Sequence, residues 1–189
     1  LAEALTGPTR VESGRVLAAG EDITRSCARS SYIAGIAHIP EDRKAIGIVP
    51  DLSLDENLIL KNFRAKRFRH GVFQSRSAIR NNAIEKIDQF SIKAGPLGSP
   101  VRLLSGGNIQ KVIIARELSE QPAVLVALYP TRGLDIGSAE YVHKVIAEGA
   151  GNGMSTILIS EDLEELYKIC DRIAVIFRGR LIGYVDPAN

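Results

Sequence analysis

The residues best suited to chemistry stand together at 105–108, where the sequence reads Ser-Gly-Gly-Asn ahead of an apolar stretch. Ser105 is a residue type that caps helices, and Gly106 and Gly107 would occupy the first turn. Because glycine has no side chain, the backbone N–H groups of that turn can approach a phosphate closely, and the helix dipole adds favourable potential. The pattern therefore predicts an anion-binding helix start. A plain loop and cap would account for the same residues equally well.

A second segment favours the anion-binding interpretation over a plain loop and cap. The apolar run 123–128 predicts a strand buried on both faces of a sheet, and Tyr-Pro-Thr-Arg-Gly-Leu-Asp follows it at 129–135. Together with Ser105–Asn108, this segment resembles the signature motif and D-loop of ABC-type ATPases. The resemblance covers about residues 1–184. It implies that Ser105, Gly106, Gly107, Asn108 and Asp135 bind a nucleotide in trans, by completing the ATP site of a partner domain.

Further segments fit the same family in order. Pro-Glu-Asp-Arg at 40–43 stands where most members carry the Q-loop glutamine, and Ser-Glu-Asp-Leu at 160–163 stands at the switch. Residues 51–58 resemble the opening of the helical subdomain, and residues 171–180 resemble the closing strands. The motifs Pro-Glu-Asp-Arg, Gly-Gly-Asn-x-Gln-Lys and Pro-Thr-Arg-Gly-Leu-Asp most resemble those of the C-terminal ATP-binding half of importer ATPases for simple sugars or nucleosides. Glu41 then either takes part in coupling to a permease or is a surface carboxylate paired with Arg43.

One expected motif is missing from the chain. The family's phosphate-binding loop reads G-x-x-x-x-G-K-[ST], and no Gly-Lys dipeptide occurs here. The chain opens on Leu1 and its single methionine is Met154. We therefore expect it to be part of a longer polypeptide in which the loop lies just upstream of Leu1.

Three further departures lie within the chain. The resemblance places the Walker B aspartate at Leu128, the catalytic glutamate at Tyr129 and the switch histidine at Glu161. Leucine offers no ligand atom for Mg²⁺, a phenol is a poor base at neutral pH, and a carboxylate would repel a γ-phosphate. We expect no catalytic residue and no metal ligand in this half. ATP and Mg²⁺ belong to the full assembly, and neither is expected to bind tightly to this part alone.

The resemblance also implies partners and a location. These are the N-terminal ATP-binding half of the same polypeptide, membrane permease subunits and, indirectly, an extracellular substrate-binding protein, at the cytoplasmic face of the plasma membrane. Two alternatives stay open: a non-transport ABC ATPase acting on nucleic acid or ribosomes, and a purely structural ABC module. The first would use the basic and aromatic segment 61–70, although a solvated helix with Phe63 and Phe68 facing the core is the favoured interpretation. Nucleic acid is not an expected partner.

Composition argues against a polyanionic partner, a membrane-spanning helix, a disulfide framework and a zinc site. The 189 residues are 45% hydrophobic and carry a net charge of +2, too little to indicate a polyanionic partner. Residues 123–129 form the longest apolar run, far short of the ~20 residues that a spanning helix needs. Cys27 and Cys170 are far apart in sequence, so neither a disulfide framework nor a zinc cluster is indicated. The three histidines show no ligand spacing.

The elements that must position these residues follow from periodicity. We expect strands over 15–20, 35–40, 123–128, 156–159 and 172–177. We expect helices that begin at 55 and that cover 75–90, 138–148 and 162–169. For the helix over 75–90, Ser77 offers a start signal and residues 95–96 offer a stop signal. Strand and helix alternation predicts an α/β fold. Its type would be a P-loop NTPase-like ABC core, mainly a parallel sheet with flanking helices, with a short antiparallel β region and an inserted helical subdomain. The expected division is 1–54 for the first part of the core, 55–100 for the helical subdomain and 101–189 for the signature helix and the rest of the core.

Overall fold

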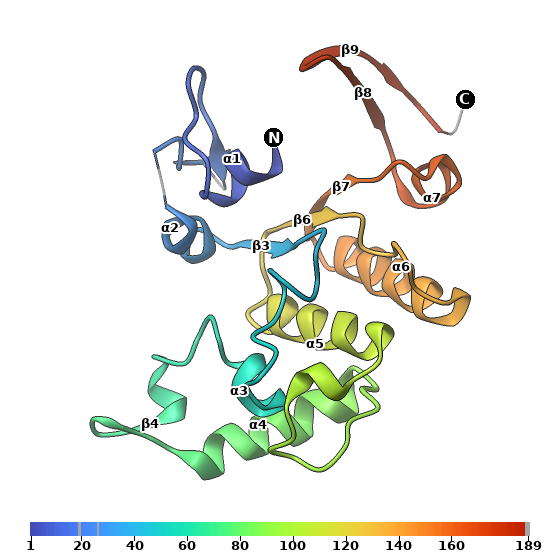
Figure 1. The fold of residues 1–189 in the computed structure, drawn as a ribbon. Helices are drawn as coiled ribbons and strands as arrows, with labels where there is room; N and C mark the ends of the chain where they lie inside the picture. Colours follow the sequence, from blue (N-terminus) through green and yellow to red (C-terminus); the bar gives the residue numbers. More distant parts are fainter. Residues whose placement is uncertain (19, 26, 188–189) are drawn as a thin grey trace.

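The centre of the fold is a three-stranded parallel sheet in the order β3-β6-β7 (Figure 1). The computed structural model describes residues 1–18, 20–25 and 27–187. The strands are β3 (Ile36–Ile39), β6 (Val124–Leu128) and β7 (Ser155–Ile159), which confirms the strands expected there. Because all three run in parallel, their carboxyl ends and the loops that follow lie at one edge of the sheet.

Alternation along β6 sends neighbouring residues to two different cores. Leu125 and Ala127 pack with α5 (Gly106–Leu118) and α6 (Ile136–Gly151), whereas Val126 packs on the opposite face. That opposite face is covered by the first part of the chain, with α1 (Ala2–Thr6) contributing Ala2. A strand with both faces buried needs apolar side chains at every position, which is why this stretch contains no polar residue.

The first part of the chain is built from short elements. The pair β1 (Leu17–Ala18) and β2 (Glu21–Asp22) is antiparallel, and α2 (Ala28–Ile33) leads into β3. The strand expected over 15–20 is thus confirmed at 17–18, while residue 19 lies outside the described residues.

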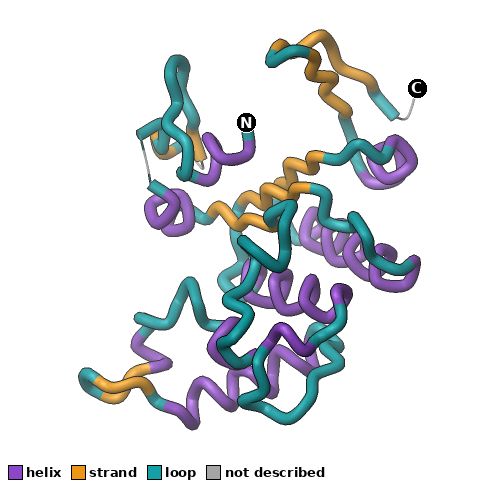
Figure 2. Tube along the Cα trace, viewed as in Figure 1, coloured by secondary structure: helices purple, strands orange, loops and turns teal. Residues whose placement is uncertain are grey.

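A helical part lies on the far side of α5 from the sheet (Figures 1 and 2). It contains α3 (Leu54–Leu58), α4 (Arg76–Gln89) and two 3-10 turns, η1 (Lys66–Phe68) and η2 (Val101–Leu103). Ser53 caps α3 in a reciprocal pair with Glu56. Ser75 rather than Ser77 caps α4, and the helix ends at Gln89 rather than near 95–96. A cap must have extended backbone, and Ser77 lies inside the helix.

The segment 61–70 does not form the helix that was expected. It contains η1 and then β4 (Arg69–His70), which pairs with β5 (Phe73–Gln74) in an antiparallel hairpin. Phe68 is buried in a cluster with Ile59 and Ile79, as expected, but Phe63 is 41% exposed. Gly71 supplies the positive φ that the two-residue turn requires.

The last strands form a separate hairpin. After α7 (Leu163–Ile169), β8 (Ile173–Phe177) pairs antiparallel with β9 (Arg180–Val185). The strand expected at 172–177 therefore exists, but it joins β9 instead of the three-stranded sheet. Several large apolar side chains of this hairpin are exposed: Val175, Ile176, Phe177, Leu181, Ile182, Tyr184 and Val185. Among the residues described, no helix has the length and apolar character to span a membrane.

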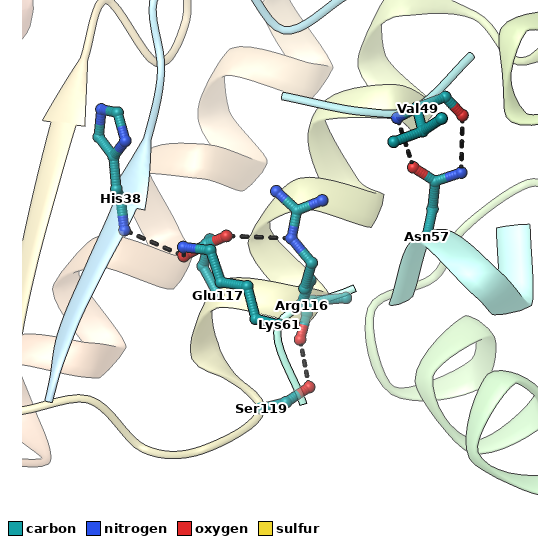
Figure 3. Close-up of polar contacts among 8 residues, drawn as sticks. His38, Val49, Asn57, Lys61, Arg116, Glu117 and Ser119 are labelled. Carbon is teal, nitrogen blue, oxygen red and sulfur yellow. Dashed lines mark hydrogen bonds and ion pairs between the residues drawn. The ribbon is translucent and has the colours of Figure 1, made fainter. Parts of the chain in front are cut away.

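A buried carboxylate fastens the helical part to the sheet (Figure 3). Glu117, at the end of α5, accepts a hydrogen bond from the backbone N–H of His38 in β3 at 3.0 Å and pairs with Lys61 and Arg116. Its side chain has no exposed surface. Burial raises the pKa of such a carboxyl, but the two cations outweigh burial and hold the pKa of Glu117 below its ordinary value of 4.5.

Glu117→Gln tests this connection between the helical part and the sheet. The variant keeps the shape of the side chain but leaves Lys61 and Arg116 without their anion, so the free energy of unfolding should fall by about 3 kcal/mol near neutral pH. Urea unfolding as a function of pH measures this. Because the folded-state pKa is lowered, the difference from wild type should be full above pH 4.5 and shrink as the pH falls through the lower folded-state pKa.

Glu120→Gln is the matched control. Glu120 pairs with Arg67 at the surface, where an ion pair contributes about 1 kcal/mol or less. Equal losses in the two variants would contradict the role assigned to Glu117.

Candidate functional site

The first turn of α5 is the core of the candidate site. Ser105 caps the helix, as the sequence predicts, because its Oγ accepts a hydrogen bond from the Asn108 backbone N–H at 3.4 Å. The Asn108 amide supports the cap: its Nδ2 donates to Ser105 Oγ at 2.9 Å, and its Oδ1 accepts from the Lys93 N–H at 2.7 Å. Ser105 is exposed, and this N-terminus carries no acidic residue in its first turn.

Gly107 lies where two helix starts meet. A Cβ at this position would overlap Ser138 Oγ and stand 3.2 Å from Ser138 Cβ and 3.7 Å from Asp135 Oδ2. Since Ser138 belongs to the first turn of α6, Gly107 allows the starts of α5 and α6 to touch. A side chain at position 107 would therefore displace Ser138, a constraint that the sequence pattern did not reveal.

Gly106 has a different environment. A Cβ there would be in ordinary contact with the Arg43 guanidinium, 3.7 Å from its Nε. The space beside Gly106 is thus open to a small group and lined by a positive charge. Backbone N–H groups, a helix dipole and a guanidinium converge here, and all three favour an anion.

Asp135 caps α6 and neutralises its N-terminus. Its Oδ1 accepts from the Ser138 N–H at 3.0 Å, and its Oδ2 accepts from the Ser138 hydroxyl at 2.7 Å. The Ser138 side-chain hydrogen bond is the largest cause that lowers the pKa of Asp135. The start of α6 thus carries its own carboxylate, whereas the start of α5 has only a neutral serine. Of these two adjacent helix starts, α5 is the one that can accept an external anion.

The loop after β3 connects to the loop after β6. Arg43 Nη2 donates to the carbonyl oxygens of Arg132, at 2.8 Å, and of Gly133, at 3.3 Å. Arg132 in turn donates to Glu41 Oε1 at 2.7 Å. Glu41 is therefore an exposed carboxylate paired with Arg132 rather than with Arg43. These contacts bring residues 41–43, 132–135 and the start of α5 together at one edge of the sheet.

The three residues that the sequence predicts to depart from the family pattern lie at the end of β6 and just after β6 and β7. Leu128, the last residue of β6, pairs in register with Ile159 and packs partly buried against the apolar cluster of the first part of the chain. Tyr129 has a φ of 45° and its N–H donates to the Ile159 carbonyl at 2.8 Å, while its ring lies under the Arg132 guanidinium at 5.5 Å. Glu161 is exposed, and within the described residues it forms no hydrogen bond or ion pair.

A divalent cation such as Mg²⁺ is bound through oxygen ligands. Leu128 offers no oxygen, and the described part of the chain contains no group of three His, Cys, Asp or Glu side chains that could hold a metal ion. The side chains at the ends of β6 and β7 thus supply neither a metal ligand at Leu128 nor a carboxylate base at Tyr129.

One buried polar contact near the candidate site could not be predicted from the sequence. Glu165 of α7 is only 3% exposed, and its Oε1 accepts a hydrogen bond from Thr131 Oγ1 at 2.8 Å and lies 2.9 Å from His143 Nε2. This carboxylate fixes the segment after β6 to α6 and α7. The signal available in the sequence was a glutamate on the apolar face of a short helix, next to Leu166.

Comparison with known proteins places these features in context. The sequence model of the ABC transporter family matches residues 1–131. The guanosine import ATP-binding protein of Bacillus subtilis is 38% identical over 99% of this chain and 37% of its own length. The nucleoside import ATP-binding protein of Lactococcus lactis is 36% identical with the same coverage, and the glucose import ATP-binding protein of Haloferax volcanii is 35% identical over 100% of this chain and 35% of its own. The chain thus spans little more than a third of these relatives.

Solved structures agree on the fold. A nucleotide-free ATP-binding cassette from an ABC transporter superposes with a TM-score of 0.79 at 20% identity, over 98% of this chain and 74% of that one. A dimeric ATP-binding cassette bound to ADP and phosphate superposes with a TM-score of 0.77 at 19% identity, over 98% and 78%. The architecture is therefore the α/β arrangement of these cassettes.

Paired glycine variants test the packing at the start of α5. Gly107→Ala should lower the free energy of unfolding by about 1–3 kcal/mol, because the methyl group forces Ser138 away from Asp135. Gly106→Ala should be neutral or stabilising by up to about 1 kcal/mol, since its Cβ fits and alanine favours a helix. Urea unfolding of both variants measures the difference.

A second-site change completes this test. Gly107→Ala combined with Ser138→Gly should lose less stability than the sum of the single changes, because the overlapping atoms are gone. Strict additivity, or equal effects at both glycines, would show that the two helix starts do not touch as described.

Proposed function

The chain belongs to the ABC transporter family of ATP-binding domains, and on that basis we propose that it is the C-terminal nucleotide-binding half of an importer ATPase for sugars or nucleosides. Support comes from relatives whose names state guanosine, nucleoside and glucose import, and which align with this chain over nearly its full length. The proposed cis partner is the N-terminal ATP-binding half of the same polypeptide. Membrane permease subunits and an extracellular substrate-binding protein complete the assembly, with this half peripheral at the cytoplasmic face of the membrane.

In this proposal the start of α5 acts in trans. Ser105, Gly106 and Gly107 present backbone N–H groups to the phosphates of an ATP held by the partner half, and Arg43 adds a positive charge beside Gly106. Asn108 and Asp135 complete the proposed set that binds the nucleotide in trans, and they also hold the two helix starts in place. The observation that carries the proposal is the pairing of a capped, accessible and acid-free helix start with an adjacent helix start that neutralises itself.

The half's own site is silent in this proposal. ABC ATPases bind ATP with Mg²⁺, but Leu128, Tyr129 and Glu161 replace the residues that would hold the metal, activate water and contact the γ-phosphate. A leucine packed into an apolar cluster does not fit a metal ligand's place. We assign no catalytic step to these three residues, and the chemistry belongs to the site that the partner half contains.

The proposal also keeps a division of the chain into 1–54, 55–100 and 101–189. The cluster of Ile59, Phe68 and Ile79 supports the middle unit, because it lies entirely within 55–100. Glu117 and Lys61 join that unit to the signature helix.

ATP turnover of the complete polypeptide with its permease is the decisive measurement, and Gly106→Asp is the variant. Aspartate fits at the first position of a helix beside Arg43, so folding and assembly should be unchanged. It would place a carboxylate where a phosphate is proposed to sit. Turnover should fall at least about tenfold, which corresponds to 1.4 kcal/mol of lost transition-state stabilisation.

Gly106→Asn is the matched control, because it has the same size without the charge and should retain more of the turnover. Turnover unchanged by Gly106→Asp would reject action in trans and favour the structural module. Gly107 is unsuitable for this experiment because any side chain there disturbs Ser138.

A further inference from the structure

The middle of the chain carries a concentration of positive charge that the nucleotide chemistry does not use. Residues 57–84 contain no aspartate or glutamate, although the whole chain has a net charge of only +2. The basic residues in this stretch are Lys61, Arg64, Lys66, Arg67, Arg69, Arg76 and Arg80. The rest of the chain is therefore net negative, and the positive charge is local.

Two of these cations form ion pairs. Lys61 pairs with the buried Glu117, and Arg67 pairs with Glu120. Within the described ranges, no ion pair is formed by the remaining five, which are all exposed: Arg64, Lys66, Arg69, Arg76 and Arg80. An anionic partner would meet them without breaking any ion pair in the chain.

The same stretch projects an apolar tip. The β4–β5 hairpin stands at the outer edge of the helical part, away from the sheet (Figure 1). Val72 at its turn is 82% exposed, and Phe73 is 76% exposed. Apart from the two neighbours of Gly71 in the chain, no atom of the described residues lies within 4 Å of a Cβ built on Gly71, so the turn faces open space.

The base of the hairpin is fixed. Phe68 is buried between Ile59 and Ile79, and the Ser75 N–H donates to the Phe68 carbonyl at 2.9 Å. The tip is thus a projection on a packed base, which lowers the ordering cost of docking.

We propose that residues 64–76, the basic hairpin, dock on an anionic lipid surface. Val72 and Phe73 would enter the boundary between headgroups and acyl chains, while Arg64, Lys66 and Arg69 contact the headgroup phosphates. An apolar tip flanked by basic residues is the chemistry of peripheral membrane attachment. The lipid surface is the proposed occupant because the tip itself, Val72 and Phe73, is apolar and lies next to the basic residues; the exposed Phe73 ring makes a single-stranded nucleic acid the alternative that the test must separate.

Vesicle co-flotation tests the proposal without involving the nucleotide site. The chain should bind vesicles of equal parts phosphatidylglycerol and phosphatidylcholine in about 100 mM salt more strongly than vesicles of phosphatidylcholine alone. The triple variant Arg64→Gln, Lys66→Gln, Arg69→Gln should lose most of this selectivity, at about fivefold in affinity for each basic residue removed. Val72→Ser with Phe73→Ser should weaken binding to the anionic vesicles severalfold and leave far-UV circular dichroism unchanged.

Two matched controls separate the hairpin from the rest of the surface. Arg10→Gln, Arg25→Gln and Arg29→Gln together remove the same charge from exposed positions elsewhere, and Phe177→Ser removes an exposed aromatic from the β8–β9 hairpin. Both should retain the preference for anionic vesicles. Equal binding to the two vesicle types, or equal losses in the controls, would overturn the proposal. Binding of a single-stranded RNA homopolymer that the first triple variant abolishes, without selective vesicle binding, would replace the lipid surface by nucleic acid.

Discussion

The close contact between Gly107 and Ser138 is the constraint on which the site depends. It brings the N-termini of two helices together, and two positive helix ends side by side would repel each other unless one were neutralised. Asp135 supplies that neutralisation to α6 through its two hydrogen bonds with Ser138. The start of α5 has no acidic residue in its own first turn, and Arg43 brings a positive charge beside Gly106. Gly107 makes the contact between the two helices possible, and Gly106 leaves space beside Arg43. The two glycines of the motif therefore have separate physical roles.

Much of this could be predicted from the sequence because the signals are local. The all-apolar run of β6 indicated a strand buried on both faces, and Ser105 before two glycines indicated a cap. The contacts that could not be predicted join residues far apart in the sequence. The hydrogen bonds between Thr131 and Glu165 and between His38 and Glu117 depend on how the helices pack against the sheet. The sequence of a helix does not indicate which of its charged residues will be buried. The basic segment after α3 was misjudged for a related reason: its composition suits a solvated helix, but Gly71 permits a tight turn and Phe68 fixes the base of a hairpin.

The end of β6 and the loop that leads to Asp135 differ in a way that supports the proposed division of labour between two ATP-binding halves. Where β6 ends, Leu128 packs partly buried among the apolar neighbours of the first part of the chain. Tyr129 follows with a positive φ, a conformation that costs a non-glycine residue free energy of order 1–3 kcal/mol and that the surrounding contacts must offset. The Ile159 carbonyl and the Arg132 guanidinium supply such contacts. The loop that leads to Asp135 is therefore held in place, which the proposed action on a partner half requires.

Helix α5 connects this surface to the remainder of the molecule. With 13 residues it is about 20 Å long, and both of its ends are fastened. At its start Gly107 abuts α6, and at its end Glu117 joins the backbone of β3 to Lys61 of the helical part. Side chains between these ends are buried on both the sheet side and the α3 side, so the helix has no free face along which to slide. A shift of the helical part would consequently move the start of α5 as well, because a rigid helix held by a desolvated ion pair transmits displacement more readily than it bends. The proposed anion site and the buried ion pair lie at opposite ends of one helix. Under the proposed function, a displacement of the helical part would therefore reach the phosphates of the partner half's nucleotide.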